Sequence, residues 1–291
     1  MNTADHFTND REARAFLTAV AEPDHQALAD LVAEEGPVAA ATRFLTGTLD
    51  VPLAKRLTPR IPRTPFRKNI DRWQAQGIHF DIPGDDGYQT GLSDLPAPPV
   101  GLWRRGQAST KERHIGIGGA RACTGYGERV TDTLVHGLVT ENVGIVAGLA
   151  FGIDGAAHRA TLDAGGTTIA FMAGGLDRVY PIAHDMLFAR MLDHGGVAYS
   201  EVAPETSATK WRFLARNRLI AAASDAVVVV EAGTRSGSLS TARHATTLPR
   251  PLGAVPGPVD SPVSAGCHRL LREHGATAVT TPAEALQLVA Q

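Results

Sequence analysis

The fold of this chain is decided by residues 142–175, which read NVGIVAGLAFGIDGAAHRATLDAGGTTIAFMAGG. A short apolar run leads into the turn Gly148–Gly152, and a helical pattern of small and apolar residues follows until Gly165-Gly166. A second apolar run, 169–172, then leads into another turn, Gly174-Gly175. This order predicts one strand–helix–strand unit with a glycine turn at the carboxyl end of each strand.

The carboxyl end of the strands is the edge at which open parallel sheets bind their ligands. Glycine lets the backbone come close to an anion, and the amino terminus of a helix attracts negative charge. Asp154 stands where the N-cap of the predicted helix is expected. The unit therefore predicts both the sheet and the edge of the sheet that carries the function.

Strands and helices continue to alternate from His114 to the end of the chain. The expected strands are 114–118, 197–202, 226–231, 252–255 and 277–279, and the expected helices are 126–141, 184–194, 216–223, 239–247, 267–273 and 282–290. This alternation is typical of an α/β fold, and Ala226–Val230 has the continuous apolar character of a strand buried on both faces. We expect an extended Rossmann-like, doubly wound, mostly parallel sheet. Short strands near 78–80 and 101–103 are expected to extend its edge.

The chain divides into three regions. Residues 1–50 have apolar residues at helical spacing, which predicts a small all-helical, SAM-like domain. Residues 51–72 are basic and rich in proline, and are interpreted either as a solvated linker or as an arm along a phosphate backbone. The cations of this segment are Lys55, Arg56, Arg60, Arg63, Arg67, Lys68 and Arg72. Residues 73–291 form the extended Rossmann-like domain. Because the chain ends soon after Leu288, no C-terminal winged helix is expected.

Composition limits the class of protein. The 291 residues are 43% hydrophobic and 20% charged, with a net charge of −2, which is typical of a globular α/β protein. This charge argues against a uniformly basic nucleic-acid binder, although a local basic groove is compatible with it. Cys123 and Cys267 lie far apart, so neither a disulfide framework nor a zinc site is expected, and a reducing cytoplasm fits. No signal peptide is apparent, and no apolar run approaches the roughly 20 residues of a membrane span.

Two motifs have both a structural and a functional interpretation. Gly116–Arg121 is an incomplete dinucleotide fingerprint, and the guanidinium of Arg121 suits either a phosphate or a neighbouring acid. Asp154 and His158 lie one helical turn apart, which suits an acid–base pair or metal ligands, but also an N-cap beside a satisfied core histidine. We favour the second interpretation, because no third ligand or nucleophile presents itself. We therefore expect no catalytic residue, no metal and no cofactor.

Basic and hydroxyl residues follow the later strands. Arg216-Asn217-Arg218 stands at the expected start of a helix, after Trp211 and Phe213, and cations interleaved with aromatic rings suit unpaired nucleic acid strands. The alternative is a solvated helix end over a core tryptophan. Arg235–Ser238 follows the strand that ends at Glu231 and suits an anion at a helix start. Since each of these segments follows the carboxyl end of a strand in one predicted sheet, we expect them to meet in one groove.

Taken together, these segments resemble the DNA-processing protein A (DprA/Smf) family over roughly residues 113–285. The matching segments are Gly118–Arg121, Gly148–Asp154 with Ala157-His158, Gly175–Asp177 with Tyr180-Pro181, Ala215–Ile220, Val230–Ala232, Arg235–Leu239, Val255–Gly257 and Ser264–His268. The segment Pro98–Trp103 and the helical N-terminal region also look like the part of the family that precedes the sheet. One motif alone would be weak, whereas the whole set in this order and spacing is highly specific.

The resemblance implies an extended Rossmann fold that binds single-stranded DNA without catalysis. It also implies a homodimer that protects incoming strands and helps to load a strand-exchange recombinase, as in natural transformation. The phosphate-gripping arginine of the family falls on Arg121. The full set of candidate DNA- and phosphate-binding residues is Gly118, Gly119, Arg121, Gly148, Phe151, Gly152, Gly174, Gly175, His184, Lys210, Arg216, Asn217, Arg218, Arg235, Ser236 and Gly237.

Three positions depart from the family pattern. Phe151 stands where the family usually has Lys or Arg, Ile182 stands where a basic residue often follows Tyr-Pro, and His184 stands where Asn is usual. Each lost phosphate contact should lower the single-strand salt slope by about 0.7. Phe151 and His184 offer base stacking in compensation, which is typically worth about 1–3 kcal/mol per base.

Two other functions stay open. Related Rossmann folds cleave nucleotide N-glycosidic bonds with a Pro-Gly-Gly-x-Gly-Thr loop and a downstream Glu, whereas Ala173–Asp177 lacks that pattern. The remaining hypothesis is a sensor that binds a free nucleotide or dinucleotide.

Overall fold

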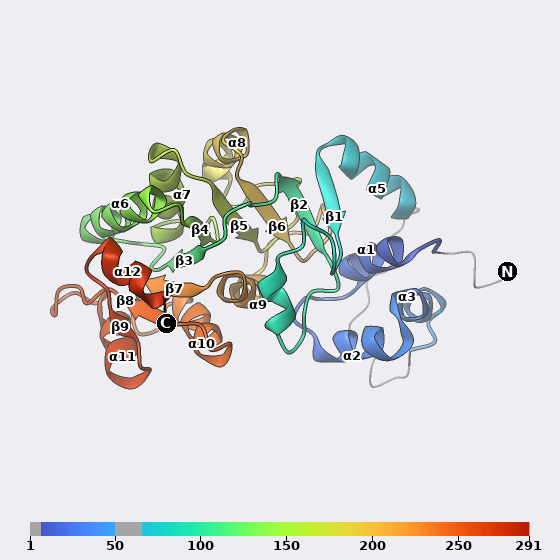
Figure 1. Ribbon diagram of the computed structural model, residues 1–291. Coiled ribbons are helices and arrows are strands. Elements are labelled where there is room, and N and C mark those ends of the chain that lie inside the picture. The colour runs from blue at the N-terminus through green and yellow to red at the C-terminus, as the bar shows by residue number, and fades with distance from the viewer. Residues whose placement is uncertain (1–6, 50–65, 291) are drawn as a thin grey trace.

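The computed structural model describes residues 7–49 and 66–290, and the described chain is built around one mixed sheet (Figure 1). The strand order is β1-β2-β6-β5-β4-β3-β7-β8-β9. The strands are β1 (Ile78–Asp81), β2 (Leu102–Gly106), β3 (His114–Gly118), β4 (Gly144–Ala147), β5 (Thr168–Met172), β6 (Val197–Ser200), β7 (Ala226–Val229), β8 (Leu252–Ala254) and β9 (Thr277–Ala278). Strands β3 to β9 pair in parallel, whereas β1 and β2 add an antiparallel edge beside β6. Both the mostly parallel α/β fold and the predicted edge strands are therefore confirmed.

The order in which the chain builds the sheet reverses at β3. From β3 the chain proceeds through β4, β5 and β6 on one side, and then returns to place β7, β8 and β9 on the other side. In doubly wound sheets, this switch point opens a crevice outside the carboxyl ends of the two strands that flank it. The topology therefore places the candidate site where β3 and β7 end.

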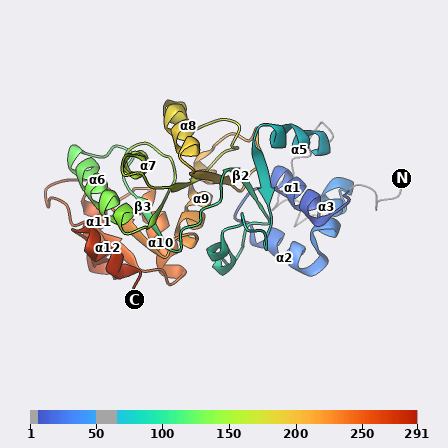
Figure 2. The ribbon, with the colours of Figure 1, turned by 45° about the horizontal axis from the view of Figure 1, so that its top comes forward.

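Helices cover both faces of the sheet (Figures 1 and 2). One face carries α6 (Gly125–Thr140), α7 (Ile153–Asp163), α8 (Asp185–Asp193) and α12 (Pro282–Leu288), and the other carries α9 (Lys210–Ala222), α10 (Ser238–Thr247) and α11 (Ala265–Glu273). Strand β7 illustrates the division, because Val228 packs toward α6 and α7 while Val227 and Val229 pack toward α9 and α10. Two short 3₁₀ helices, η2 (Thr90–Asp94) and η3 (Ile182–His184), lie in the connections.

A separate group of helices lies beyond the antiparallel edge in both views (Figures 1 and 2). It consists of α1 (Asp10–Val20), α2 (Gln26–Glu35) and α3 (Pro37–Thr46), which share a hydrophobic core, with α5 (Phe66–Ala75) beside them. The boundaries of the predicted domains remain predictions. None of the helices within residues 7–49 and 66–290 has the length and apolar character needed to cross a membrane.

The predicted basic linker 51–72 is only partly described. Its cations Lys55, Arg56, Arg60 and Arg63 lie outside the described residues. Its last part is not extended, because α5 begins at Phe66, directly after the final proline of the segment. Once no further proline interrupts the chain, the backbone is free to form a helix.

Candidate functional site

A groove of about 1080 Å³ lies at the carboxyl ends of β3 and β7, where the strand order reverses. The loop after β3 forms one wall, and the first turns of α9 and α10 form the other. The predicted site residues that line the groove are Gly118, Gly119, Arg121, Lys210, Arg216, Asn217, Arg235, Ser236 and Gly237. These nine of the sixteen predicted residues therefore meet in one groove, as expected from the sequence, and the other seven do not line it.

Arg121, which lines this groove, lies over an aromatic ring. Its guanidinium carbon is 4.5 Å from the centroid of Phe213, and the same ring lies 5.6 Å from the ring of Tyr180. Arg121 is exposed, and no carboxylate of the described residues forms an ion pair with it. Among the described residues, Arg121 is therefore not the surface arginine paired with an acid that the alternative interpretation expected. Neither Phe213 nor Tyr180 was among the predicted site residues.

Glu231 holds the loop that presents Arg121, and it too was missed. Its side chain is 1% exposed and accepts hydrogen bonds from the backbone N–H of Thr124, at 2.8 Å, and from Thr124 Oγ1, at 2.6 Å. The backbone N–H of Ala120 donates to the carbonyl oxygen of Glu231 at 2.7 Å. Thr124 is also the N-cap of α6, where a buried carboxylate is favoured by the helix dipole. Its signals in the sequence were its place at the end of a central strand and its position inside the matching segment Val230–Ala232.

Arg216 lines the groove from a buried position, and not from a helix start as predicted. Helix α9 begins at Lys210, because Thr209 caps it by accepting a hydrogen bond from the backbone N–H of Arg212. Arg216 is 5% exposed, and its Nη1 donates to the carbonyl oxygen of Phe171 at 2.5 Å. Burial lowers the pKa of Arg216 to about 10, against the opposing effect of the Asp154 carboxylate. The side chain therefore supplies charge from below the groove.

Gly148 makes room for this arginine. A Cβ atom at position 148 would lie 1.9 Å from Nη1 of Arg216, so only glycine fits against the guanidinium. Gly152 has a φ of +75° and is the N-cap of α7, so the prediction that Asp154 is that N-cap was wrong. Asp154 instead accepts a hydrogen bond from the backbone N–H of Gly148 at 3.0 Å. Burial raises the pKa of Asp154, and the nearby charge of Arg216 opposes this shift.

His158 is a satisfied core histidine, as predicted. Its Nε2 accepts a hydrogen bond from the backbone N–H of Leu149 at 3.3 Å, and its Nδ1 lies 2.8 Å from Oγ1 of Thr168. Burial lowers the pKa of His158 to about 3, so the ring is neutral near neutral pH. Within the described parts of the chain, no group of three or more His, Cys, Asp or Glu residues is placed to hold a metal ion.

Gly174 and Gly175 lie away from the groove. A Cβ at position 174 would meet the backbone of Thr206 and Ala208 at about 3 Å, and a Cβ at position 175 would lie 2.7 Å from Cα of Pro204. The backbone N–H of Gly175 donates to the carbonyl oxygen of Thr206 at 2.8 Å. Segment 203–208 thus occupies the space beside Gly174 and Gly175 in which the sequence predicted an anion. The two glycines allow this segment to pack against the turn after β5.

Arg218 faces away from the groove. It is 2% exposed, and its Nη2 lies 2.6 Å from Oε1 of Glu201 while its Nε lies 2.9 Å from Oδ1 of Asp24. Successive residues of a helix point about 100° apart, so Arg216 and Asn217 can line the groove while Arg218 does not. The prediction that Arg218 faces a phosphate is corrected by these two ion pairs, which occupy its buried guanidinium.

Phe151 is exposed beside the groove, but His184 is not. The Phe151 side chain is 48% exposed, and its ring meets the ring of His184 edge-on at 5.1 Å. His184 is 7% exposed and its Nδ1 lies 3.0 Å from the carbonyl oxygen of Leu149, so its ring supports Phe151 and is not itself available for stacking. Further exposed apolar side chains follow β5 or begin α9, namely Tyr180, Ile182, Met186, Trp211 and Leu214.

The amino terminus of α10 completes the groove. Its N-cap, Gly237, makes no capping bond through a side chain, and the hydroxyls of Ser236 and Ser238 lie 2.8 Å apart at the same end. Asn217 of α9 donates through Nδ2 to the carbonyl oxygen of Gly237 at 3.1 Å and so ties the two helix ends together. Hydroxyls at the positive end of a helix dipole form a favourable place for an anion.

Comparisons with known proteins agree on one family. The family model described as DNA recombination-mediator protein A matches residues 79–290. A Mycobacterium tuberculosis relative of the DNA processing protein DprA type is 42% identical over 291 aligned residues, covering 95% of this chain and 74% of its own length. Protein Smf of Escherichia coli is 38% identical, covering 76% of this chain and 60% of its own length.

Solved structures give the same result. DNA processing protein A of Streptococcus pneumoniae superimposes with a TM-score of 0.71 at 29% identity, over 98% of this chain and 95% of that chain. DNA processing protein A of Helicobacter pylori, whose structure was described for its mode of single-stranded DNA binding, superimposes with a TM-score of 0.64 at 28% identity. It covers 73% of this chain and 96% of its own.

Proposed function

Since the chain belongs to the DNA recombination-mediator protein A family, we propose that it binds single-stranded DNA in the groove at the switch point of its sheet. The observation that carries this proposal is the meeting of Arg121, Phe213 and Lys210, from two separate elements, in one groove. Phosphates need cations and unpaired bases need flat partners, and this groove offers both side by side.

The charge of the groove supports a polyanionic ligand, although the chain as a whole has a net charge of −2. Its cationic lining residues are Arg121, Lys210, Arg216 and Arg235, and Asp154 is the acidic residue among the lining residues. A local excess of positive charge in a groove concentrates an anionic ligand regardless of the sign of the total charge. The single-stranded DNA binding named for the Helicobacter pylori relative is consistent with this reading.

Phe151 gives the binding surface a stronger preference for bases. The usual family cation at this position would add a phosphate contact, whereas an exposed ring adds a stacking surface. His184 contributes by holding that ring in place from below. The strand then lies with its phosphates toward Arg121 and Arg235 and with bases near Tyr180 and Phe151.

The proposed role is binding and not turnover. Asp154 and His158, which are the acid and base candidates of the sequence, are both engaged in internal hydrogen bonds under the groove. In this proposal the protein protects single strands and helps to load a strand-exchange recombinase, as a cytoplasmic homodimer that serves natural transformation or recombination. It needs no cofactor and no metal for this role.

Binding measurements with three ligands distinguish single-stranded DNA binding from the two alternatives, a nucleotide sensor and an N-glycosidic hydrolase. Fluorescence anisotropy with labelled oligo-dT, with a duplex of equal length and with a mononucleotide as competitor gives three affinities under one set of conditions. We expect the single strand to bind, the affinity to fall with salt, and the mononucleotide to compete poorly. Tight mononucleotide binding without oligo-dT binding would instead support a nucleotide sensor, and release of free base would support an N-glycosidic hydrolase.

A further inference from the structure

The first turns of α9 form a wall of the groove but have little buried surface of their own. Lys210 and Phe213 line the groove, and Trp211 and Leu214 are exposed. Arg212 is different, because it is 4% exposed and points away from the groove. Arg212 is therefore the buried residue of the first turn, where its partners hold the helix, and Ala215 and Arg216 are buried one turn later.

Those partners include a loop of the N-terminal helices. Arg212 donates to the carboxylate of Glu22 through Nε at 2.9 Å and through Nη2 at 2.8 Å, and its Nη1 donates to the carbonyl oxygen of Ser207 at 2.5 Å. Glu22 belongs to the loop between α1 and α2. A bidentate pair of this kind fixes geometry as well as distance.

One turn and a half further along α9, a second arginine reaches the same loop. Arg218 lies between Asp24, at 2.9 Å, and Glu201, at 2.6 Å. Burial raises the pKa of Glu201, and the charge of Arg218 opposes that shift. We call Glu22, Asp24, Glu201, Arg212 and Arg218 together the α9 clasp.

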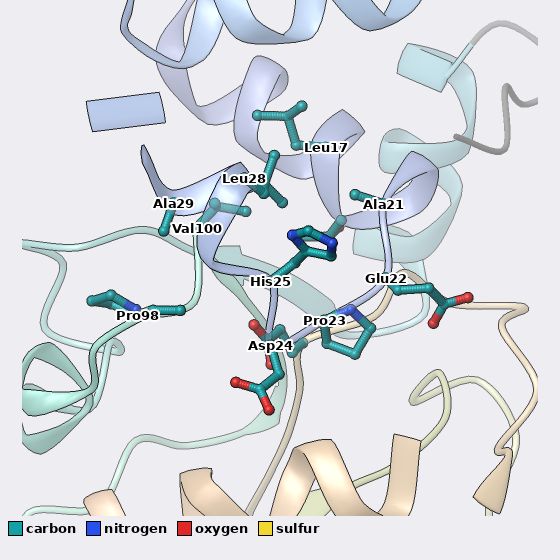
Figure 3. A pocket seen from close by; sticks show the side chains of 13 residues that line it. Leu17, Ala21, Glu22, Pro23, Asp24, His25, Leu28, Ala29, Pro98 and Val100 are labelled. Atoms are coloured by element: carbon teal, nitrogen blue, oxygen red, sulfur yellow. The ribbon is translucent and has the colours of Figure 1, made fainter. Parts of the chain in front are cut away.

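The clasp closes with almost no space between the two parts. Next to Arg212, the cavity between the loop and α9 is about 10 Å³. A second cavity of about 20 Å³ lies between the same loop and the segment before β2, and Figure 3 shows it lined by loop residues such as Pro23 and His25 and by Leu28. A space of this size holds about one water molecule, so it is not a site for a ligand. The junction is a mechanical contact between the N-terminal helices and the DNA-facing helix.

We propose that Arg212 and Arg218 are positioning residues through which the N-terminal helices set the affinity of the groove. The carboxyl-terminal half of α9 is held by the core through Leu219, Ile220 and Ala221. Its amino-terminal half carries Lys210 and Phe213 and is tied to the N-terminal helices through Arg212, while Arg218 ties the following turns to the same loop. Opening the clasp therefore loosens the groove wall without removing any group that touches DNA. This inference rests on the proposed function for its effect on affinity.

The test uses the full chain with Glu22→Gln and Asp24→Asn combined, both of which lie outside the groove. We expect the affinity for oligo-dT to fall about tenfold, within the usual range of coupling between sites. The slope of log affinity against log salt should stay unchanged, because no phosphate contact is lost. Hydrogen exchange of the amides of 211–216 should accelerate, while that of 219–222 should not.

Glu35→Gln is the matched control, because Glu35 pairs with Arg43 within the N-terminal helices and not with α9. The single variant Glu22→Gln, measured below its melting temperature, guards against a double variant that fails to fold. Unchanged affinity together with unchanged exchange would overturn the proposal. If the wild-type chain bound no single strand, the proposed function would fail, and the exchange measurement would still decide whether the clasp holds α9.

Discussion

Arg121 and Phe213 meet across the switch point of the sheet, with 4.5 Å between the guanidinium carbon and the ring centroid. Arg121 follows β3 and Phe213 lies on α9, so this contact joins the two walls of the groove. Arg216 approaches the same ring at 5.8 Å. Positive charge over an aromatic face is stabilising, and it keeps the guanidinium of Arg121 at the mouth of the groove without neutralising it.

Replacing Arg121 by alanine should weaken oligo-dT binding by about 1.5–3 kcal/mol, because a charge-assisted contact to phosphate is lost. The salt slope should fall by about 0.7 for the one lost contact. Anisotropy titrations at several salt concentrations measure both quantities. Arg113→Ala, at the opposite end of β3, is the matched control and should change neither. An Arg121→Ala variant that kept the wild-type slope would exclude this placement of the phosphate.

Phe213→Ala combined with Arg121→Ala tests whether the two side chains act as a pair. A double-mutant cycle on oligo-dT affinity should give a coupling of about 0.5–2 kcal/mol, as expected for a cation over a ring. Strictly additive effects would mean that ring and guanidinium contact DNA independently.

Phe151→Ala should reduce oligo-dT affinity by about 1–3 kcal/mol through the loss of one stacking surface, with no change in salt slope. Phe151→Lys should instead raise the slope by about 0.7, since it restores a cation near the strand. An abasic oligonucleotide is the internal control, because the alanine variant and wild type should bind it equally. Equal binding of normal oligo-dT by both proteins would remove Phe151 from the site.

Glu231→Gln should destabilise the protein by about 1–3 kcal/mol, because a buried acceptor of two hydrogen bonds is changed. It should also weaken oligo-dT binding at temperatures where the variant is folded, since the loop that carries Arg121 loses its anchor. Thermal unfolding and anisotropy measure the two effects. Glu128→Gln, on the exposed side of the same region, serves for comparison, and an affinity drop of the same size there would argue against an anchoring role for Glu231.

His158 should make the folded state sensitive to acid. Its pKa of about 3 in the folded state lies below the unfolded value of about 6.5, so between these values the unfolded chain binds a proton that the folded chain does not. The free energy of unfolding should therefore fall as the pH drops below 6.5, by up to about 1.4 kcal/mol per pH unit. Denaturant unfolding at pH 5.0 and 6.5 tests this. His158→Gln should flatten the dependence and the exposed His274→Gln should keep it.

The sheet and its functional edge were predictable because they depend on local patterns. Apolar runs that end in glycine turns specify parallel strands and mark their carboxyl ends, as the segment Gly148–Gly152 illustrates. The segments after β3 and β7 then had to meet, since neighbouring parallel strands end at one edge. Arg121 and Ser236 could be assigned to one groove for this reason.

What could not be predicted depends on partners far away in the sequence. Nothing near Arg218 indicates that Asp24 and Glu201 would surround it, so its cation was taken for a DNA contact. The start of α9 was misplaced because the capping residue, Thr209, lies outside the apolar pattern on which the helix was assigned. Phe213 was noted only as an aromatic residue near Arg216 and was not placed in the site, because its contact with Arg121 depends on the fold.

Photocrosslinking identifies the residues that touch the bases of a bound single strand. An oligo-dT containing 5-iododeoxyuridine is bound to the full chain, irradiated and digested, and the crosslinked peptides are identified by mass spectrometry. If single-stranded DNA binds in the groove, we expect crosslinks to the aromatic residues of the groove and its rim, above all Phe213, Tyr180 and Phe151. Crosslinks confined to the opposite end of the strands, around Arg113 and Glu141, would contradict it.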